Sequence, residues 1–319
     1  TYWYCRTNYA LASMSLKTIK NKIKSVKKIR QVTRAMEAVS AVKMRKSQQK
    51  AFAARPYAES ALSILSRVSG SKEIASHPLF TLRPQINKTL LVVVTADRGL
   101  AGSLNSTLFR EVGKLMTLER LTRQTAEVIA IGRKGREHFE RRGFRVQNHF
   151  ERWGEWVDID SPSQIVASIL SGYNAGAFDR AFIVYTNFLS TFKQEAVVRQ
   201  FLPISIAALT AVVAGIAPVA GTYAGGAKAS ISDSVEYVLE PSISAIVDAL
   251  VPRLLSIELY HAVLESNASE HSARMVAMKM ASDRARDLTK ELTLEFNKAR
   301  QGAITSEISE LVGGLEAMR

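Results

Sequence analysis

Apolar and polar positions follow a helical pattern over a long stretch near the start of the chain. From Leu16 to about Ala58 good helix formers dominate and the first proline is Pro56, so we expect one long helix. Its apolar positions begin at heptad spacing and then shift to three-residue steps, which predicts either a coiled coil whose seam drifts around the helix or a helix that touches different partners along its length. The early seam positions are Ile19, Ile23 and Val26, and the later ones are Ile29, Val32, Met36, Val39 and Val42.

The C-terminal part of the chain has the same helical character. No proline follows Pro252, so we expect a terminal helix of more than about 60 residues, or roughly 90 Å. A helix of that length cannot fold into a compact core. Small residues at heptad spacing along it allow another helix to approach closely. This predicted seam consists of Ala262, Ser266, Ser269, Ala273, Val276 and Met280.

Between the two predicted helices, short apolar runs alternate with helical patterns. Continuous runs rich in β-branched residues predict buried strands, and helical segments separate the first three of them. This alternation predicts an α/β fold with a small, doubly wound, mainly parallel sheet. The strands are expected at 90–95, 126–131, 181–186 and 195–202, and the helices at 104–121, 134–142 and 162–174.

Positive charge is concentrated in the first predicted helix. The 319-residue chain has a formal net charge of +14, and residues 16–55 hold thirteen Lys or Arg against one acid, Glu37. Such a helix can bind nucleic acid phosphates, or it can pair with another helix inside an acidic protein environment. Residues 16–50 contain no aromatic side chain for base stacking, and their seam is apolar, so the pattern favours the protein environment.

Motifs for catalysis or cofactor binding are weak. Residues 97–103 follow the first strand, where a helix N-terminus could hold phosphate, but the G-x-G-x-x-G spacing is absent and a tight turn is favoured. In the P-loop-like spacing from Gly221 to Gly226, Ala227 replaces the phosphate-binding lysine. The five histidines form no H-E-x-x-H motif, and Cys5 is the single cysteine. We therefore expect no catalytic residues, no cofactor and no metal site.

Two further segments bear on membranes and targeting. The uncharged stretch 201–227 is long enough to cross a bilayer, but its prolines and glycines make it a poor candidate. Residues 1–13 lack the apolar core of a secretory signal and are expected to be a leader of doubtful origin.

Three blocks of residues, in order along the chain, share motifs with one known family. They are the basic helix opening Ser15–Ile29 with Thr33–Glu37, the loop Thr95–Gly102, and the terminal runs Glu265–Met278 and Leu292–Thr305. In these blocks the chain resembles the gamma subunit of the F-type ATP synthase.

The resemblance implies a rotor shaft. The two terminal helices are expected to wind as an antiparallel coiled coil inside a hexamer of alternating alpha and beta subunits. The α/β domain is expected near the membrane, on the ring of c subunits and beside the epsilon subunit. The expected segments are the leader 1–13, the N-terminal helix 14–60, the α/β domain 61–203, an Ala/Gly-rich connection 204–244 that departs from the family pattern, and the C-terminal helix 245–319.

The resemblance also implies which residues contact partners. Arg300 and Gln301 match a pair that contacts a beta-subunit loop, and Met36 and Lys43 lie in the matching stretch of the first helix. An apolar tip is expected to turn within the hexamer as a bearing. The tip residues are Ile304, Ile308, Leu311, Val312 and Leu315.

The predicted function is the coupling of ion-driven rotation of the c ring to conformational change in the catalytic beta subunits. Membrane contact is expected only through the complex, at the cytoplasmic face of a bacterial plasma membrane or the matrix face of a mitochondrial inner membrane, with no nucleic-acid partner. Two other hypotheses remain at this stage. One is a nucleic-acid-binding coiled-coil protein with a doubly wound head, and the other is a nucleotide-dependent enzyme built on the sheet.

Overall fold

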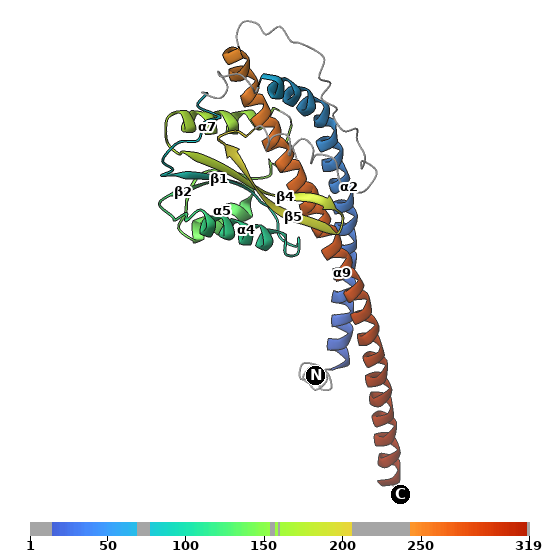
Figure 1. The fold of residues 1–319 in the computed structure, drawn as a ribbon. Helices are drawn as coiled ribbons and strands as arrows, with labels where there is room; N and C mark the ends of the chain where they lie inside the picture. Colours follow the sequence, from blue (N-terminus) through green and yellow to red (C-terminus); the bar gives the residue numbers. More distant parts are fainter. Residues whose placement is uncertain (1–14, 69–76, 154–156, 159, 206–242, 318–319) are drawn as a thin grey trace. The chain divides into compact units, whose positions relative to one another are not determined.

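Two long helices, three shorter helices and a five-stranded sheet make up the described part of the chain (Figure 1). The computed structural model describes residues 15–68, 77–153, 157–158, 160–205 and 243–317, so the expected leader and most of the expected 204–244 connection lie outside it. The chain divides into a helical unit, residues 1–39 with 275–319, and a sheet unit, residues 40–274. Within the described ranges, no helix has both the length and the hydropathy needed to cross a membrane.

The elements follow the predicted order, with one strand that the sequence pattern did not predict. They are α2 (Leu16–Val68), β1 (Thr89–Val94), α4 (Leu104–Leu118), β2 (Ala126–Ile131), α5 (Arg133–Arg141), β3 (Arg145–Phe150), α7 (Ser163–Asn174), β4 (Arg180–Ser190), β5 (Lys193–Leu202) and α9 (Ile243–Ala317). Both long helices extend beyond the prolines that were expected near their ends, so Pro56 and Pro252 lie inside α2 and α9.

The sheet has the strand order β3-β2-β1-β4-β5, and only β5 runs antiparallel to its neighbour. Helices α4 and α5 cover one face, while α7 and the first part of α9 cover the other (Figure 1). Successive strand side chains point to opposite faces. Leu91 and Val93 of β1 therefore pack with α4, and Leu90 and Val92 pack with α7 and α9. This explains why the strand sequences are apolar without interruption.

The unpredicted strand is β3, at the edge of the sheet. Its sequence is polar and most of its side chains are exposed, so it lacks the apolar run that marks the buried strands. It pairs in parallel with β2 through its backbone, beside the buried carboxylate of Glu127. Arg145 and Gln147 of β3 donate hydrogen bonds to that carboxylate.

The small residues of α9 pack against the sheet. Strand β1 pairs with β4 only as far as Val184, so the backbone of Thr186 has no strand beside it on that side. The Thr186 amide donates a hydrogen bond of 3.1 Å to Ser266 Oγ, and Ser269 Oγ donates one of 3.2 Å to the Thr186 carbonyl. Farther along, Ser272 Oγ donates to the Thr191 carbonyl at 2.6 Å. Serine hydroxyls thus satisfy buried backbone groups that the sheet leaves unpaired.

We predict that Ser266→Ala lowers the free energy of unfolding by about 1–3 kcal/mol, because the buried amide of Thr186 then lacks an acceptor. Chemical denaturation of the purified chain measures this change. Ser306→Ala, on the exposed end of the same helix, serves as the control and should stay within about 0.5 kcal/mol of the parent. Equal effects of the two substitutions would show that the Thr186 bond contributes nothing.

A group of buried ionisable side chains lies where α9 crosses β4 and β5. Burial raises the pKa of Glu258 to about 8 and that of Glu265 to about 7, while the guanidinium of Arg199 opposes both shifts. Burial also raises the pKa of Tyr185 well above its usual value, and Arg199 lies 5.7 Å from the Tyr185 ring. The pKa of His261 falls to about 4, again through burial.

The raised pKa of Glu258 predicts a pH-dependent stability. The unfolded carboxyl titrates near 4.5 and the folded one near 8, so between these values the folded chain binds the additional proton. The Glu258 contribution to stability therefore falls as the pH rises, by roughly 1 kcal/mol per pH unit. Relative to the parent, Glu258→Gln should gain stability at that rate between pH 5.5 and 7.5 in denaturation experiments. Exposed Glu307→Gln is the control, and a flat difference for Glu258→Gln would contradict the assignment.

Candidate functional site

The loop after β1 caps α5, the helix that follows the neighbouring strand β2. Three residues in a row accept hydrogen bonds from the first backbone N–H groups of α5. The Asp97 carboxylate accepts from Arg133 at 2.9 Å, the Ala96 carbonyl from Lys134 at 3.1 Å, and Thr95 Oγ1 from Gly135 at 2.8 Å. These N–H groups are the ones that a helix offers to a phosphate. In this chain they are already bonded to the loop.

Close backbone packing accompanies this cap. Gly132 has a φ of +101°, and a Cβ there would lie 2.1 Å from the Thr95 carbonyl oxygen. The other side of the loop is held by Arg274 of α9, which donates to the carbonyls of Arg98 and Gly99 at 3.3 and 3.2 Å and forms an ion pair with Glu270. The bonds support the predicted tight turn, and they tie the loop to α9 within the sheet unit.

The helical unit consists of the start of α2 and the last part of α9. In Figure 1 the first residues of α2 (blue) and the last residues of α9 (red) lie toward the same end, so the two helices run antiparallel. Helix α2 crosses this unit from Leu16 to Val39, roughly 36 Å, whereas α9 crosses it from Met275 to Ala317, roughly 64 Å. The final stretch of α9 therefore has no α2 residue opposite it.

In the helical unit, buried and half-buried residues of α2 form a stripe along one face of the helix, called here its covered stripe. These residues keep a strict heptad spacing. Ile19 and Thr33 are buried, and the positions between and after them on the same face are half-buried. The stripe continues into polar residues, and of the later apolar positions only Met36 is half-buried, so the predicted drift of the seam was wrong. Its members in this unit are Ile19, Ile23, Val26, Arg30, Thr33 and Glu37.

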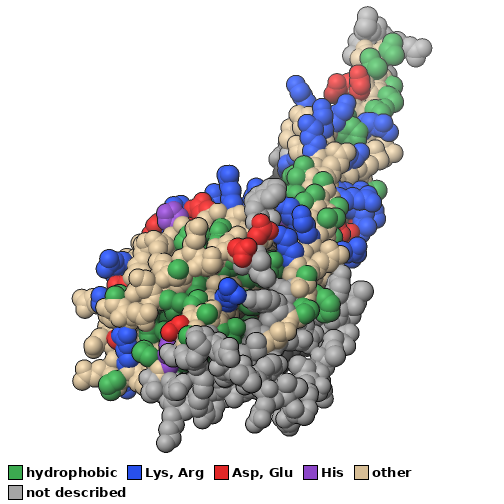
Figure 2. Space-filling view, turned by 90° about the horizontal axis from the view of Figure 1, so that it is seen from above, with side chains coloured by type: hydrophobic (Ala, Val, Ile, Leu, Met, Phe, Trp, Pro, Cys, Tyr) green, Lys and Arg blue, Asp and Glu red, His purple; other side chains and the backbone are tan. Residues whose placement is uncertain are grey.

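The other apolar residues that suggested the drift lie on the outside. Ile29, Val32 and Val39 are 55%, 58% and 55% exposed, and Val42, in the sheet unit, is exposed as well. In the space-filling view, Lys and Arg side chains lie next to apolar ones along the long helices (Figure 2). The outer surface of the helical unit is thus both apolar and cationic.

The covered stripe of α9 also differs from the predicted one. Met278, Ser282, Ala285 and Leu292 are buried at heptad-related spacing, while Met280 is 69% exposed and lies outside the stripe. Two other predicted seam residues, Ala273 and Val276, are half-buried. The predicted heptad series of small residues, which ended at Met280, begins on the face of α9 that packs on β4. The face of α9 toward α2 is a different one.

The end of α9 is exposed on all sides. Residues 301–315 are all exposed, beginning where α2 has run out. Five large aliphatic side chains occur among them, at the end of the long helix α9. They are Ile304 (49% exposed), Ile308 (56%), Leu311 (65%), Val312 (53%) and Leu315 (70%).

The family model described as ATP synthase matches residues 15–318, which is nearly the whole chain. The chain belongs to the ATP synthase gamma chain family. It is 39% identical over 303 residues to the ATP synthase gamma chain of Heliobacterium modesticaldum, covering 95% of this chain and 99% of that one. The gamma chain of Methylobacillus flagellatus is 40% identical over 303 residues, with the same coverage.

A solved structure shares the gamma-chain fold. The match is to a chain of the Euglena gracilis mitochondrial ATP synthase, in a structure that contains OSCP, F1 and the c ring. It has a TM-score of 0.61 and 19% sequence identity, and it covers 95% of this chain and 94% of that chain.

The structure places the predicted contact residues of this gamma-family chain in both units. Arg300 and Gln301 are exposed on α9, and Met36 is half-buried on α2, all within the helical unit. Lys43 is half-buried and belongs to the sheet unit. Their role as partner contacts stays a prediction, as does the bearing role of the α9 tip. The outward apolar row of Ile29, Val32 and Val39 is a further candidate contact surface that the sequence pattern alone assigned to the seam.

The corrected seam can be tested at two nearby methionines of α9. Met278 is 5% exposed and Met280 is 69% exposed. We expect Met278→Gln to lower the free energy of unfolding by about 1–3 kcal/mol, because a buried apolar side chain is replaced by a polar one. Met280→Gln should change it by less than about 0.5 kcal/mol. Loss of helical circular dichroism during urea denaturation measures both, and a larger effect at Met280 would restore the originally predicted seam.

Proposed function

We propose that this chain is the central rotor shaft of an F-type ATP synthase. It couples rotation of the c ring to conformational change in the catalytic beta subunits. The exposed aliphatic tip of α9 is the observation that carries this proposal, because a surface of this kind is stable only when another protein encloses it. Membership of the gamma chain family supports the same function.

The tip suits a turning bearing. Dispersion and hydrophobic contact have no preferred direction, so aliphatic side chains such as Ile308 and Leu311 can turn against an apolar sleeve with little change in energy. Directional groups do the opposite, since hydrogen bonds and ion pairs depend on geometry and distance. Arg300 and Gln301 are such groups, and we assign them to contact with a beta-subunit loop at one angle of rotation.

Charge on α2 fits an acidic enclosure. Residues 16–55 carry a net charge of +12, and most lysines of the helical unit are exposed. Acidic loops of the surrounding subunits would attract this surface, and they would distinguish its angular positions because the charge is unevenly placed. A shaft shifts a partner between conformations only when it contacts them differently. An uneven surface satisfies that requirement.

The other partners and the location follow from the same assembly. The alpha and beta subunits enclose the helical unit, and the c ring and the epsilon subunit bind the sheet unit. The chain supplies no catalytic residue and needs no cofactor, so the chemistry of ATP belongs to the partner subunits. The complex holds it at the cytoplasmic face of a bacterial plasma membrane, or at the matrix face in a mitochondrion.

Reconstitution tests the proposal. The chain should co-purify with a tagged beta subunit in the presence of alpha, and the assembled hexamer should hydrolyse ATP. Arg300→Ala with Gln301→Ala should lower ATP turnover about tenfold and reduce the torque, because the loss of charged hydrogen bonds costs at least about 1.4 kcal/mol.

The matched control is Lys290→Ala with Glu291→Ala, which removes another exposed polar pair from α9 and should leave turnover near that of the parent. Failure of the chain to enter the hexamer would overturn the proposed function. Normal turnover and torque of the Arg300 and Gln301 variant would overturn only the assignment of those contacts.

A further inference from the structure

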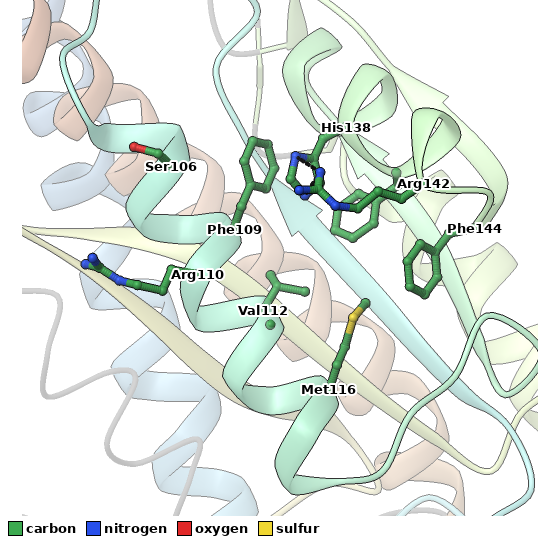
Figure 3. A pocket seen from close by; sticks show the side chains of 10 residues that line it. Ser106, Phe109, Arg110, Val112, Met116, His138, Arg142 and Phe144 are labelled. Atoms are coloured by element: carbon green, nitrogen blue, oxygen red, sulfur yellow. Dashed lines mark hydrogen bonds between the residues drawn. The ribbon is translucent and has the colours of Figure 1, made fainter.

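A groove of about 510 Å³ lies between α4 and α5 on the outer face of the sheet unit (Figure 3). Its floor is formed by Val112 and Phe139, which are buried, and its walls by Phe109, Met116 and Phe144, which are half-buried. Phe139 makes edge-to-face contacts with both other phenylalanines, at centroid distances of 6.1 and 5.8 Å. The groove therefore offers a preformed apolar surface of rings and a flexible thioether.

A glycine in the middle of α4 keeps the groove open. Gly113 lines it, and a Cβ built there would meet nothing within 4 Å. Its φ is not in the left-handed region, so the helix itself does not require glycine at this position. Glycine weakens a helix relative to alanine. Gly113 is therefore unfavourable for the helix, although the chain has free space for a side chain there. A partner that packs closely against the backbone of α4 would explain the glycine.

The charge at the groove is positive. Arg142 Nη1 lies 2.7 and 2.8 Å from the two ring nitrogens of His138 and can donate to whichever one carries no proton, and His138 stacks on Phe109 at 3.6 Å. Burial and the nearby Arg142 and Arg141 lower the pKa of His138 to about 4, so its ring is neutral at pH 7. None of the lining residues is acidic, and within the described part of the chain Arg142 forms no ion pair. Arg142 is exposed, so its guanidinium is available to a carboxylate of a partner.

We propose that the α4–α5 groove is a docking site for an acidic segment of another subunit of the assembly. One apolar side chain of that segment enters between Phe109 and Phe144 above Gly113, and a neighbouring carboxylate pairs with Arg142. The apolar floor selects the side chain, and the guanidinium selects its acidic neighbour, which is the charge complementarity typical of specific interfaces. A groove that is open along α4 admits a peptide segment more readily than it encloses a small molecule.

Photo-crosslinking in the purified, assembled complex identifies the occupant. The chain carries p-benzoylphenylalanine in place of Met116, which lines the groove. A control chain carries it in place of Lys114, which lies on the same helix but does not line the groove. We expect the Met116 position to crosslink to one partner subunit, next to an Asp or Glu, and the Lys114 position not to reach that segment. No crosslink to another subunit, a crosslink to a segment without acids, or a bound small molecule in the groove would overturn the proposal.

Two matched pairs of substitutions test the chemistry of the groove. Gly113→Leu fills the space and Arg142→Glu reverses the charge, so each should abolish the crosslink made from Met116. Gly113→Ala should raise the melting temperature of the chain, which shows that the site tolerates a Cβ. Arg141→Glu, on an exposed neighbour outside the groove, should leave the crosslink intact. Equal crosslinking by Arg142→Glu and Arg141→Glu would contradict the predicted carboxylate contact.

This inference depends on the proposed assembly only as the source of the partner, and the two fail in different ways. If the chain does not enter the complex, the rotor function is wrong. If the complex forms and turns over normally but the Met116 position captures no acidic segment, only the groove proposal is wrong.

Discussion

The contact between α9 and the end of β4 is the constraint on which the other arrangements depend. Serine hydroxyls of α9 replace a missing strand beside Thr186, so the helix is held by directional bonds as well as by packing. Directional bonds fix the rotation of a helix about its own axis much more sharply than apolar contact does. Because the sheet covers the face of Ser266 and Ser269, pairing with α2 in the helical unit falls to a different set of α9 residues, which includes Met278.

The helical pair has an unusual distribution of polarity. Its covered stripe on α2 includes Arg30, Thr33 and Glu37, whereas Ile29 and Val32 face outward. Polar residues in a coiled-coil seam cost stability but favour one register. Apolar residues on the outside give the pair a reason to bind other proteins. Both features suit a shaft that must keep one register between its own helices and make its remaining contacts with the subunits around it.

The loop after β1 shows how one stretch of sequence can suggest two chemistries. A glycine-containing turn between a strand and a helix is the usual setting of a phosphate site in open α/β sheets. Here Thr95 to Asp97 satisfy the first amides of α5, and Arg274 holds the following carbonyls. The loop therefore joins three elements of the sheet unit, and it engages the first amides of α5.

The amino-acid sequence by itself determined the classes and order of the elements, because hydrophobic period and proline position depend on local geometry. The buried strands at 90–95 and 126–131, the long terminal helices and the excess of positive charge on α2 were all predictable in this way. The edge strand β3 was not, since it is held by backbone pairing and carries a polar sequence. The family resemblance came from specific motifs, and the comparisons confirmed it.

The tertiary structure decided which partner each face contacts. Periodicity shows that one side of a helix is buried, but it does not show whether a strand, a helix or another protein covers that side. Met280 and Val32 therefore seemed to belong to a seam and proved to be exposed, while Ser269 seemed to face a helix and packs on β4. The groove at Gly113 was hidden for the same reason, because it exists only where two helices distant in sequence lie side by side on one sheet.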